Sequence, residues 1–577
     1  MNKLEDFVTG IWNHDFTLWK ESPEEITNRL GWLDFDKEYQ DKLRLIDTEV
    51  EKIIKDGFET AVLIGMGGSS LAPLVFSKTF TREDGFLNLL ILDSTDPDFL
   101  TQIKDELDFE KTLFIVSSKS GSTIEVFSIF KYFYRLAVER MDKQRAGKSF
   151  VAITDPNSGL EKIAIDCDFR LILLNDPNIG GRYSALSYFG LFPAALLGID
   201  LNKIIERASI EKENSKGKEF RSHWDFLELA NYRKLYKEEI GMNFPVSLGS
   251  YIGNEALSGR DKLTFIMSDG INTFGQWLEQ LIAESTGKEG KGVLPVASET
   301  PGPTRFYGND RIFVKMTLAG DKSLDKIALE LKKTGHAVIE IELNDKYDLG
   351  GQIFLWEMAT AAMCHILQVN PFDQPNVEKS KILARNLLNP GTLQSQPMVV
   401  DNNIYGGNGT IEEEKQFIDG KLIERLYKII EDRREGDYFA LQCFIKESDE
   451  TSGLLAKLSS KIRELTKCPV TIGYGPRYLH STGQLHKGDR GNGIFIQLKS
   501  IKHTDMHIPE LENILGKAEG MSLVETITFG QLISAQAKGD EMALREEERR
   551  AMIINLGEDI ASGLEELIAS LNNNKHK

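Results

Sequence analysis

The sequence lacks any apolar run of about 18 residues, the length that a helix needs to cross a bilayer. Its first twelve residues, MNKLEDFVTGIW, also lack the basic region and apolar core of a secretory signal. We therefore expect neither a membrane-spanning helix nor a membrane partner.

Cysteine and histidine are scarce, with four and nine copies among 577 residues. The cysteines lie far apart, and the sequence contains neither a CxxC pair nor an HExxH motif. Widely spaced cysteines are typical of a reducing compartment rather than of a disulfide framework, so we expect a cytoplasmic protein. The scattered histidines argue against a structural zinc site, and we predict no metal ligands.

Basic residues are outnumbered, because 69 lysines and arginines face 88 aspartates and glutamates, for a net charge of −19. Nucleic-acid binding depends on basic patches that neutralise phosphates, so this balance argues against nucleic acid as the main partner. A local basic pocket for a small anion stays compatible with the composition.

What the sequence does contain is a regular alternation of short apolar runs with helix-length segments. After a helical stretch over 1–58, five such runs lie at 61–64, 87–92, 113–116, 150–153 and 171–174. A second alternation follows at 246–248, 262–267, 313–316 and 337–341, and further strand-like runs lie at 438–445, 469–473 and 493–498. This rhythm predicts an α/β fold with parallel sheets covered on both faces, and the two similar units indicate an internal duplication.

Two loops that follow predicted strands are rich in glycine and hydroxyl side chains. In LIGMGGSSLAP, residues 63–73, the glycines allow close approach of a ligand, and the following helix start attracts an anion. A plain tight turn is the alternative. In SSKSGST, residues 117–123, five hydroxyls and Lys119 precede a helix, which favours a phosphate site. The alternative is a helix cap that Glu125 completes.

Charged residues in two further motifs are candidates for catalysis. Arg182, in GGRYSALS, follows two glycines and precedes an apolar helix, although a surface ion pair is the commoner fate of a lone arginine. Glu284, in ESTGKEGKG, lies near the end of a predicted helix and is a candidate general base. An exposed glutamate at a helix end is the alternative there.

Two more motifs combine polar side chains with loop signals. In NPFDQPNVEKSK, residues 370–381, two prolines interrupt the chain, and Gln374 and Lys381 lie beside the start of a new helix. An ordinary solvated helix start is the alternative. The loop YGPRYLHSTGQLHKG, residues 474–488, carries His480 and His486, either of which could transfer protons or form structural hydrogen bonds.

Together, these motifs resemble those of the phosphoglucose isomerase family. The similar segments are GGSSLAP, SSKSGST, GGRYSALS, ESTGKEGKG, NPFDQPNVEKSK and LHSTGQ, which span residues 63–488. The likeness is greatest to the isomerase half of bifunctional transaldolase/phosphoglucose isomerases. We find no room in this sequence for the transaldolase half. Two features depart from the family: the histidine loop follows the FDQ motif instead of preceding it, and Val126 replaces a hydroxyl.

The resemblance implies two sugar-isomerase (SIS) domains, each with a largely parallel sheet in three α/β/α layers, with helical N-terminal and C-terminal extensions. The implied divisions are a helical segment over 1–58, a first SIS domain over 59–206, a second over 207–400, and a region over 401–577. That last region would carry the histidine loop and complete the second domain. The resemblance also implies a homodimer and a reaction that needs no cofactor.

The implied reaction interconverts glucose 6-phosphate and fructose 6-phosphate through a cis-enediol(ate), in glycolysis and gluconeogenesis. Glu284 would move the proton between C2 and C1, and Arg182 would stabilise the enediolate. His480 would open the sugar ring with assistance from Lys381, and Gln374 would line the site. The implied substrate-binding residues around the phosphate are Gly68, Ser69, Ser118, Lys119, Ser120 and Thr123.

Several alternatives stay open at this point. A dual-specificity phosphoglucose/phosphomannose isomerase would use the same residues, and a non-catalytic sugar-phosphate-binding SIS regulator would keep only the phosphate hydroxyls. In the family, the histidine usually comes from the neighbouring subunit, and the changed motif order leaves its origin open here. His486 is a rival to His480 for the ring-opening role.

Overall fold

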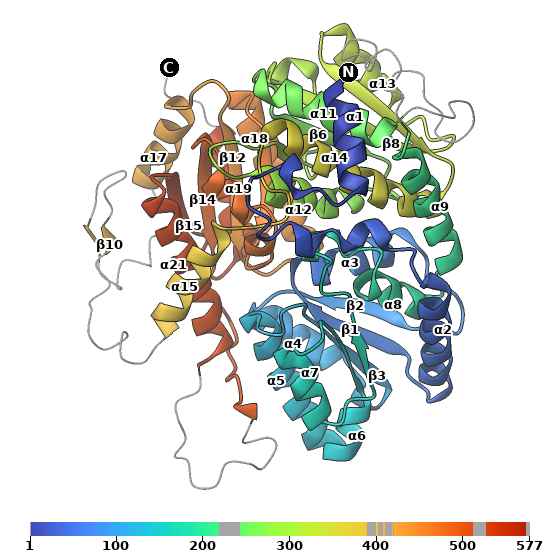
Figure 1. Cartoon of the computed structure of the whole chain (residues 1–577). Coiled ribbons are helices and arrows are strands. Elements are labelled where there is room, and N and C mark those ends of the chain that lie inside the picture. The colour runs from blue at the N-terminus through green and yellow to red at the C-terminus, as the bar shows by residue number, and fades with distance from the viewer. Residues whose placement is uncertain are drawn as a thin grey trace.

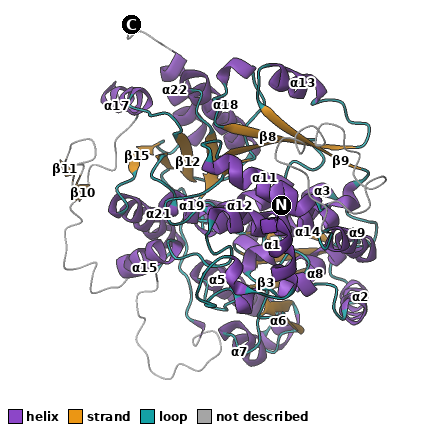
Figure 2. Ribbon diagram, turned by 45° about the horizontal axis from the view of Figure 1, so that its top comes forward, coloured by secondary structure: helices purple, strands orange, loops and turns teal. Residues whose placement is uncertain are grey.

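Three parallel β-sheets form the framework of the chain (Figure 1). This computed structural model describes residues 2–217, 243–388, 400–401, 408–409, 418, 420–511 and 527–572. In each parallel sheet the first strand in chain order lies between the second and the third. Parallel neighbours require crossover connections, which here are mainly helices that cover the sheet faces (Figure 2). The α/β class and the parallel sheets that the sequence predicts are confirmed.

The first sheet has five strands in the order β2-β1-β3-β4-β5. The strands are β1 (Thr60–Gly65), β2 (Asn88–Leu92), β3 (Thr112–Ser117), β4 (Phe150–Thr154) and β5 (Leu171–Leu174). Its helices are α3 (Leu71–Thr79), α4 (Pro97–Glu106), α5 (Ile124–Arg140), α6 (Lys143–Lys148), α7 (Gly159–Asp166) and α8 (Tyr188–Leu196). Leu63 and Ile64 enter different apolar cores, so the sheet is buried on both faces. All five strand predictions for this unit are confirmed.

The second sheet has four strands in the order β7-β6-β8-β9. Its elements are α11 (Phe244–Leu257), β6 (Lys262–Met267), α12 (Phe274–Thr286), β7 (Leu294–Val296), β8 (Arg311–Leu318), α13 (Asp325–Lys333), β9 (Ala337–Leu343) and α14 (Leu349–Leu367). The predicted strand at 246–248 is wrong, because these residues lie in α11. The Asn243 side chain accepts a hydrogen bond from the Val246 amide and Pro245 occupies the first turn, both of which favour a helix start.

The C-terminal region is more than the helical extension that the sequence predicts, because it contains a third sheet in the order β13-β12-β14-β15. Its elements are α17 (Gly420–Glu431), β12 (Tyr438–Phe444), α18 (Asp449–Thr466), β13 (Val470–Tyr474), η10 (Arg477–His480), α19 (Gly483–Gly488), β14 (Gly493–Lys499), α21 (Phe529–Glu546), β15 (Arg550–Asn555) and α22 (Ile560–Asn572). The three predicted strand-like runs are confirmed, whereas β15 has no counterpart in the prediction. These strands pair with one another in a sheet of their own. The domain boundaries at 58, 206 and 400 stay a prediction.

The N-terminal segment packs against α14, the last helix of the second sheet's group. It contains α1 (Asn2–Trp12) and α2 (Tyr39–Lys55), and its aromatic side chains enter the core shared by the first two sheets. The Trp19 indole donates to the Ala361 carbonyl of α14 at 2.9 Å and meets the Phe372 ring edge-on, with centroids 5.4 Å apart. This contact supports the turn that follows α14, where the candidate residue Gln374 lies.

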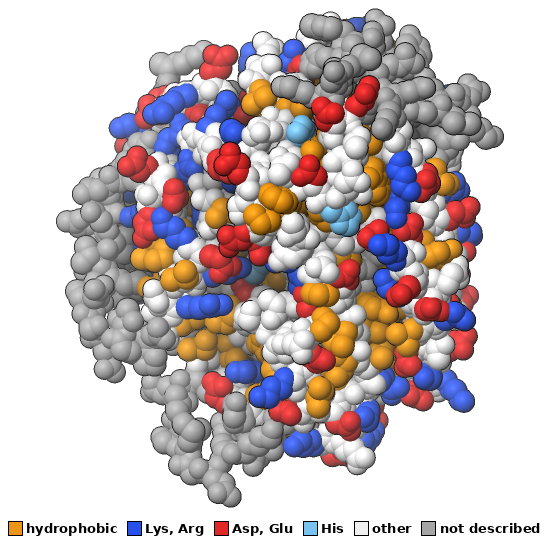
Figure 3. All heavy atoms as spheres, viewed as in Figure 1, with side chains coloured by type: hydrophobic (Ala, Val, Ile, Leu, Met, Phe, Trp, Pro, Cys, Tyr) orange, Lys and Arg blue, Asp and Glu red, His pale blue; other side chains and the backbone are white. Residues whose placement is uncertain are grey.

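The outer surface carries both acidic and basic side chains, as the composition leads us to expect. On the face shown in Figure 3, acidic and basic side chains lie interspersed. No helix in the described part of the chain is both long and apolar enough to span a membrane.

Candidate active site

Glycines bring three distant segments into contact at the carboxyl end of β1. Gly67 and Gly68 belong to the short helix η4 (Gly67–Ser69), and Gly67 has a φ of +55°. A Cβ at Gly67 would lie 2.6 Å from the His480 carbonyl oxygen, and one at Gly68 would lie 2.1 Å from the Gly181 carbonyl oxygen. Only glycine permits these approaches, so the GGS turn is a packing point for the histidine and arginine segments as well as a ligand candidate.

The hydroxyl loop lies beside this turn. The carboxyl ends of β1 and β3 are neighbours, with Gly65 opposite Ser117, and the Ser117 hydroxyl donates to the Ser69 carbonyl at 3.0 Å. From β1 the chain leads on to β2, and from β3 it leads on to β4, on the other side of β1. In open α/β sheets, ligands bind at the carboxyl ends of two neighbouring strands whose connections run in opposite directions in this way. The structure therefore brings Gly68 and Ser69 together with the 117–123 loop.

Within the loop, the hydroxyls are close to one another. The Ser118 and Thr123 oxygens lie 3.4 Å apart, and the Ser120 and Ser122 oxygens lie 2.9 Å apart. Thr123 directly precedes α5 and makes no side-chain capping bond, so its hydroxyl is not used for that purpose. The Lys119 ammonium forms an ion pair with Asp155, which offsets part of the positive charge that the sequence suggested for this loop.

Arg182 is buried, with 3% of its surface exposed, and its guanidinium joins three segments of the site. Its donors reach five acceptors: Glu284 Oε2 (3.1 Å), Gln374 Oε1 (2.8 Å), Ser285 Oγ (3.0 Å) and the carbonyls of Pro371 (2.9 Å) and Asp373 (2.8 Å). A planar group with five N–H donors in fixed directions is suited to such a position. The surface ion pair that we considered for Arg182 does not occur.

Glu284 is also buried, at 7% exposure, in the last turn of α12. Gln280, one turn earlier on the same helix face, donates its amide N–H groups to Glu284 Oε2 at 3.3 Å and to the His480 carbonyl at 2.8 Å. Sequence reasoning missed Gln280, although its i, i+4 spacing from Glu284 could have indicated it. The carboxylate is therefore held between an arginine and an amide, not exposed at a helix end.

His480 lies in the same chain as the other candidates and pairs with Glu125. Its Nε2 is 3.0 Å from Glu125 Oε1, and the Gln536 amide donates to the same oxygen at 2.7 Å. Burial alone would raise the pKa of Glu125, but the charge and hydrogen bond of His480, with a smaller contribution from Lys381, lower it. Glu125 thus orients the histidine instead of completing a helix cap, a role that sequence reasoning missed.

His486 has a different environment. It is 2% exposed and lies against the rings of Tyr438, Tyr478 and Phe495. Burial lowers the pKa of this histidine well below its ordinary value, so the ring is neutral. Because His486 contacts this apolar core and not the Arg182–Glu284 pair, the geometry favours His480 over His486 as the candidate for proton transfer.

Two lysines flank the site at different depths. Lys381, on α15 (Val377–Leu388), forms an ion pair with Glu378 at 2.8 Å and is 30% exposed, near the His480–Glu125 pair. Lys288 is buried and was not assigned a role from the sequence. Its ammonium donates to the carbonyls of Asn370 (2.7 Å) and Asp373 (2.6 Å), and burial lowers its pKa to about 8. Lys288 and Arg182 therefore fix the same turn that carries Gln374.

The assembled groups comprise a buried carboxylate beside a guanidinium, a histidine–carboxylate pair and a hydroxyl-rich helix start. Among the described residues, no three histidine, cysteine, aspartate or glutamate side chains cluster in a way that could hold a metal ion. Fold and site together define an α/β enzyme with its candidate residues at the carboxyl ends of parallel strands.

Comparisons with known proteins show which family the chain resembles. Residues 37–212 match the model of the phosphoglucose isomerase family. The chain is 26% identical over 434 residues to glucose-6-phosphate isomerase of Streptococcus pyogenes serotype M4, covering 65% of this chain and 90% of that protein. A hypothetical protein of Thermus thermophilus, whose crystal structure is known, shares the fold with a TM-score of 0.54 and 23% identity, covering 66% of this chain and 94% of that one. The resemblance to the phosphoglucose isomerase family is therefore confirmed, whereas the closer likeness to the bifunctional proteins stays a prediction.

Proposed function

We propose that this protein is an aldose–ketose isomerase that interconverts glucose 6-phosphate and fructose 6-phosphate. The observation that carries the proposal is the buried contact between Arg182 and Glu284, which unites a candidate base with a fixed cation. The family match and the S. pyogenes relatives support the same reaction.

In the proposed chemistry, Glu284 removes the proton from C2 of the open-chain aldose and returns it to C1 of the enediol. A second proton moves from the C2 hydroxyl to the C1 oxygen, so the reaction balances without an external oxidant or reductant. Negative charge develops on the enediolate oxygens, and Arg182 is proposed to stabilise it, since a preorganised donor acts without reorganisation.

His480 is proposed to open the sugar ring by giving a proton to the ring oxygen. The Glu125 carboxylate keeps the imidazole oriented through its contact with Nε2. Lys381 adds positive charge nearby, and Gln374 lines the site through its bond to Arg182. In this proposal the substrate phosphate binds at Ser69 and at the 117–123 loop before α5.

Three further expectations belong to the proposal: a sugar phosphate as the natural ligand, a homodimer and a cytoplasmic location. Because His480 contacts Gln280 and Glu125 of its own chain, we propose that the histidine acts within one subunit. Light scattering after size-exclusion chromatography measures the oligomeric state directly.

The test is a coupled assay with glucose, fructose and mannose 6-phosphates, run with and without a chelator. We expect turnover of the first two, unchanged by the chelator. Binding of fructose 6-phosphate without turnover would contradict the proposal and favour a regulatory sugar-phosphate-binding protein. The mannose 6-phosphate arm decides between a strict and a dual-specificity isomerase.

A further inference from the structure

A chain of hydrogen bonds continues from His480 beyond Glu125. Glu125 Oε1 accepts from His480 Nε2 at 3.0 Å and from Gln536 Nε2 at 2.7 Å. Gln536 Oε1 in turn accepts from the Thr95 hydroxyl at 2.9 Å. The chain of bonds therefore runs from Thr95 through Gln536 and Glu125 to the histidine, and its first two members have no role in the function proposed above.

The three residues that support the histidine are buried. Thr95 is 0% exposed, and Glu125 and Gln536 are each 4% exposed. Because water does not reach these side chains, removing one of them leaves its neighbour without a partner. The His480 side chain, in contrast, keeps 14% of its surface accessible. The buried chain of bonds thus ends at a group that a substrate can reach.

The chemistry of the groups sets the direction of each bond. Against the effect of burial, His480 and Lys381 lower the pKa of Glu125, so this carboxylate is ionised and only accepts hydrogen bonds. If the Gln536 amide were reversed, its oxygen would lie against the carboxylate oxygen. Gln536 therefore donates to Glu125 and accepts from Thr95.

The chain of bonds crosses twice between the first and the third sheet. Thr95 follows β2, and Glu125 lies in the first turn of α5, so both belong to the first sheet and its helices. Gln536 lies on α21 and His480 ends η10, so both belong to the third. Because the four residues alternate in this way, the direction of the imidazole depends on how the two sheets pack together.

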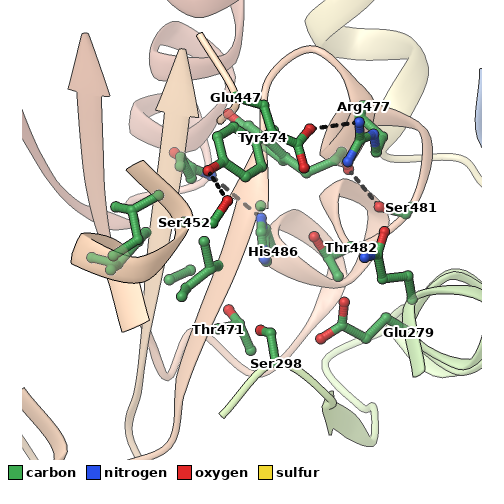
Figure 4. Close-up of a pocket in the computed structure, with 18 of the residues that line it drawn as sticks. Glu279, Ser298, Glu447, Ser452, Thr471, Tyr474, Arg477, Ser481, Thr482 and His486 are labelled. Atoms are coloured by element: carbon green, nitrogen blue, oxygen red, sulfur yellow. Dashed lines mark hydrogen bonds and ion pairs between the residues drawn. The ribbon is translucent and has the colours of Figure 1, made fainter. Parts of the chain in front are cut away.

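A second contact anchors the histidine segment to the same loop after β2. Arg477, at the start of η10, pairs with Asp93 and with Glu447, each at 2.8 Å. Figure 4 shows the Arg477 side chain directed toward Glu447. Asp93 lies two positions before Thr95, so one short segment supports both ends of η10. The ion pair holds the start of η10, whereas the hydrogen-bond chain reaches the imidazole at its end.

We propose that Gln536 and Thr95 are positioning residues for ring opening, which act through Glu125 on His480. This role rests on the proposed function, in which His480 gives a proton to the ring oxygen. Gln536 holds the Glu125 carboxylate where it orients the imidazole, and Thr95 holds the Gln536 amide. An acid must lie within about 2.6–3.2 Å of the atom that it protonates, so a displaced imidazole slows this step.

Ring opening can be measured by itself, as the exchange between the two anomers of glucose 6-phosphate followed by exchange NMR. The anomers interconvert through the open chain, so this rate does not require proton transfer by Glu284. Gln536→Met has a similar length and lacks the amide, and it should slow the catalysed exchange by about 10–100-fold, as expected for a misplaced acid. Thr95→Val should cause a smaller loss, and Thr95→Ser, which keeps the hydroxyl, should retain the parent rate.

Two comparisons separate positioning from a merely structural effect. Glu541, also buried on α21, pairs with Lys538 and Arg545 of the same helix, so Glu541→Gln should lower stability without slowing the exchange. In a His480→Ala background, Gln536→Met should cause no further loss of kcat/KM for fructose 6-phosphate, because residues that act through one another are not additive. Additive losses, or equal slowing in Glu541→Gln, would overturn the proposal.

A last measurement does not depend on activity. In protein with isotopically labelled histidine, the Nε2 proton of His480, identified by its absence from His480→Ala, should be protected from solvent exchange. Gln536→Met should lose this protection, and Glu541→Gln should keep it. Parent-like protection and parent-like anomer exchange in Gln536→Met would overturn the positioning role. If the parent turns over no sugar phosphate but Gln536→Met still releases this proton, the proposed function fails while the positioning of His480 stands.

Discussion

Replacing Arg182 with lysine tests whether the geometry of the guanidinium, and not its charge alone, is required. The arginine reaches five acceptor atoms on Glu284, Ser285 and the 371–374 turn. A lysine ammonium keeps the positive charge but has only three donors, without the planar arrangement. At least two of the five acceptors therefore lose their partner in Arg182→Lys.

The magnitude follows from these contacts. Each buried acceptor left without a partner costs about 1–3 kcal/mol, so the variant should lose about 2–6 kcal/mol of folding stability. If the guanidinium also stabilises the enediolate, kcat should fall by about 10²–10³, as for loss of a single oxyanion donor. The loss in kcat should persist at temperatures where the variant is fully folded.

Arg311 offers a matched control. It is fully buried in β8 and pairs with Glu299, away from the candidate site. Arg311→Lys should lower stability to a similar degree while leaving kcat within about twofold of the parent. Arg311 lies far from the reacting atoms, so its replacement leaves their surroundings unchanged. Steady-state kinetics and urea unfolding on both variants make the comparison. Equal losses of kcat in the two variants would refute the role assigned to Arg182.

Three further outcomes follow from the site. Ser118→Ala combined with Thr123→Val should raise KM strongly and lower kcat less, because phosphate contacts contribute similarly to ground and transition states. If steady-state kinetics instead show a loss of kcat with KM unchanged, the loop is not the phosphate site. His480→Ala should slow turnover of the ring form more than that of an open-chain substrate, and His486→Ala should be milder; a larger effect at His486 would reverse the assignment. Burial raises the pKa of Glu279 to about 8 from an ordinary 4.5, so the folded state retains a proton that the unfolded chain releases. Stability should therefore fall as pH rises between these values, and urea midpoints of Glu279→Gln should lack that slope.

The fold was largely predictable where strands are short, apolar and bounded by turn residues, as in the first sheet. The failure at 246–248 arose because three apolar residues fit a strand or a helix, and the cap at Asn243 decides the outcome. The strand β15 follows a highly charged helix end, and its register against β14 depends on contacts across the sheet. Which sheet the C-terminal strands join is likewise decided by tertiary contacts and not by the local sequence.

The site was predictable as a set of motifs but not as a network. The resemblance indicated Arg182, Glu284 and Gln374, and the structure shows them in contact. The partners Glu125 and Gln280 were missed, because their contacts with the histidine segment join residues more than 190 positions apart. Such contacts depend on how the third sheet and its helices pack against the first two sheets, and local sequence patterns do not encode that packing.

The most direct test of the central claim is turnover by Glu284→Gln in parallel with solvent exchange in heavy water. The variant keeps the shape of the side chain and removes the basic oxygen, so kcat should fall by about 10²–10⁴ or more, with little change in substrate affinity. The parent enzyme should introduce deuterium at C1 of fructose 6-phosphate or C2 of glucose 6-phosphate, because the proton held by the base exchanges with solvent part of the time. Near-normal kcat in Glu284→Gln, or no deuterium incorporation by the parent under any condition, would contradict proton transfer by this carboxylate.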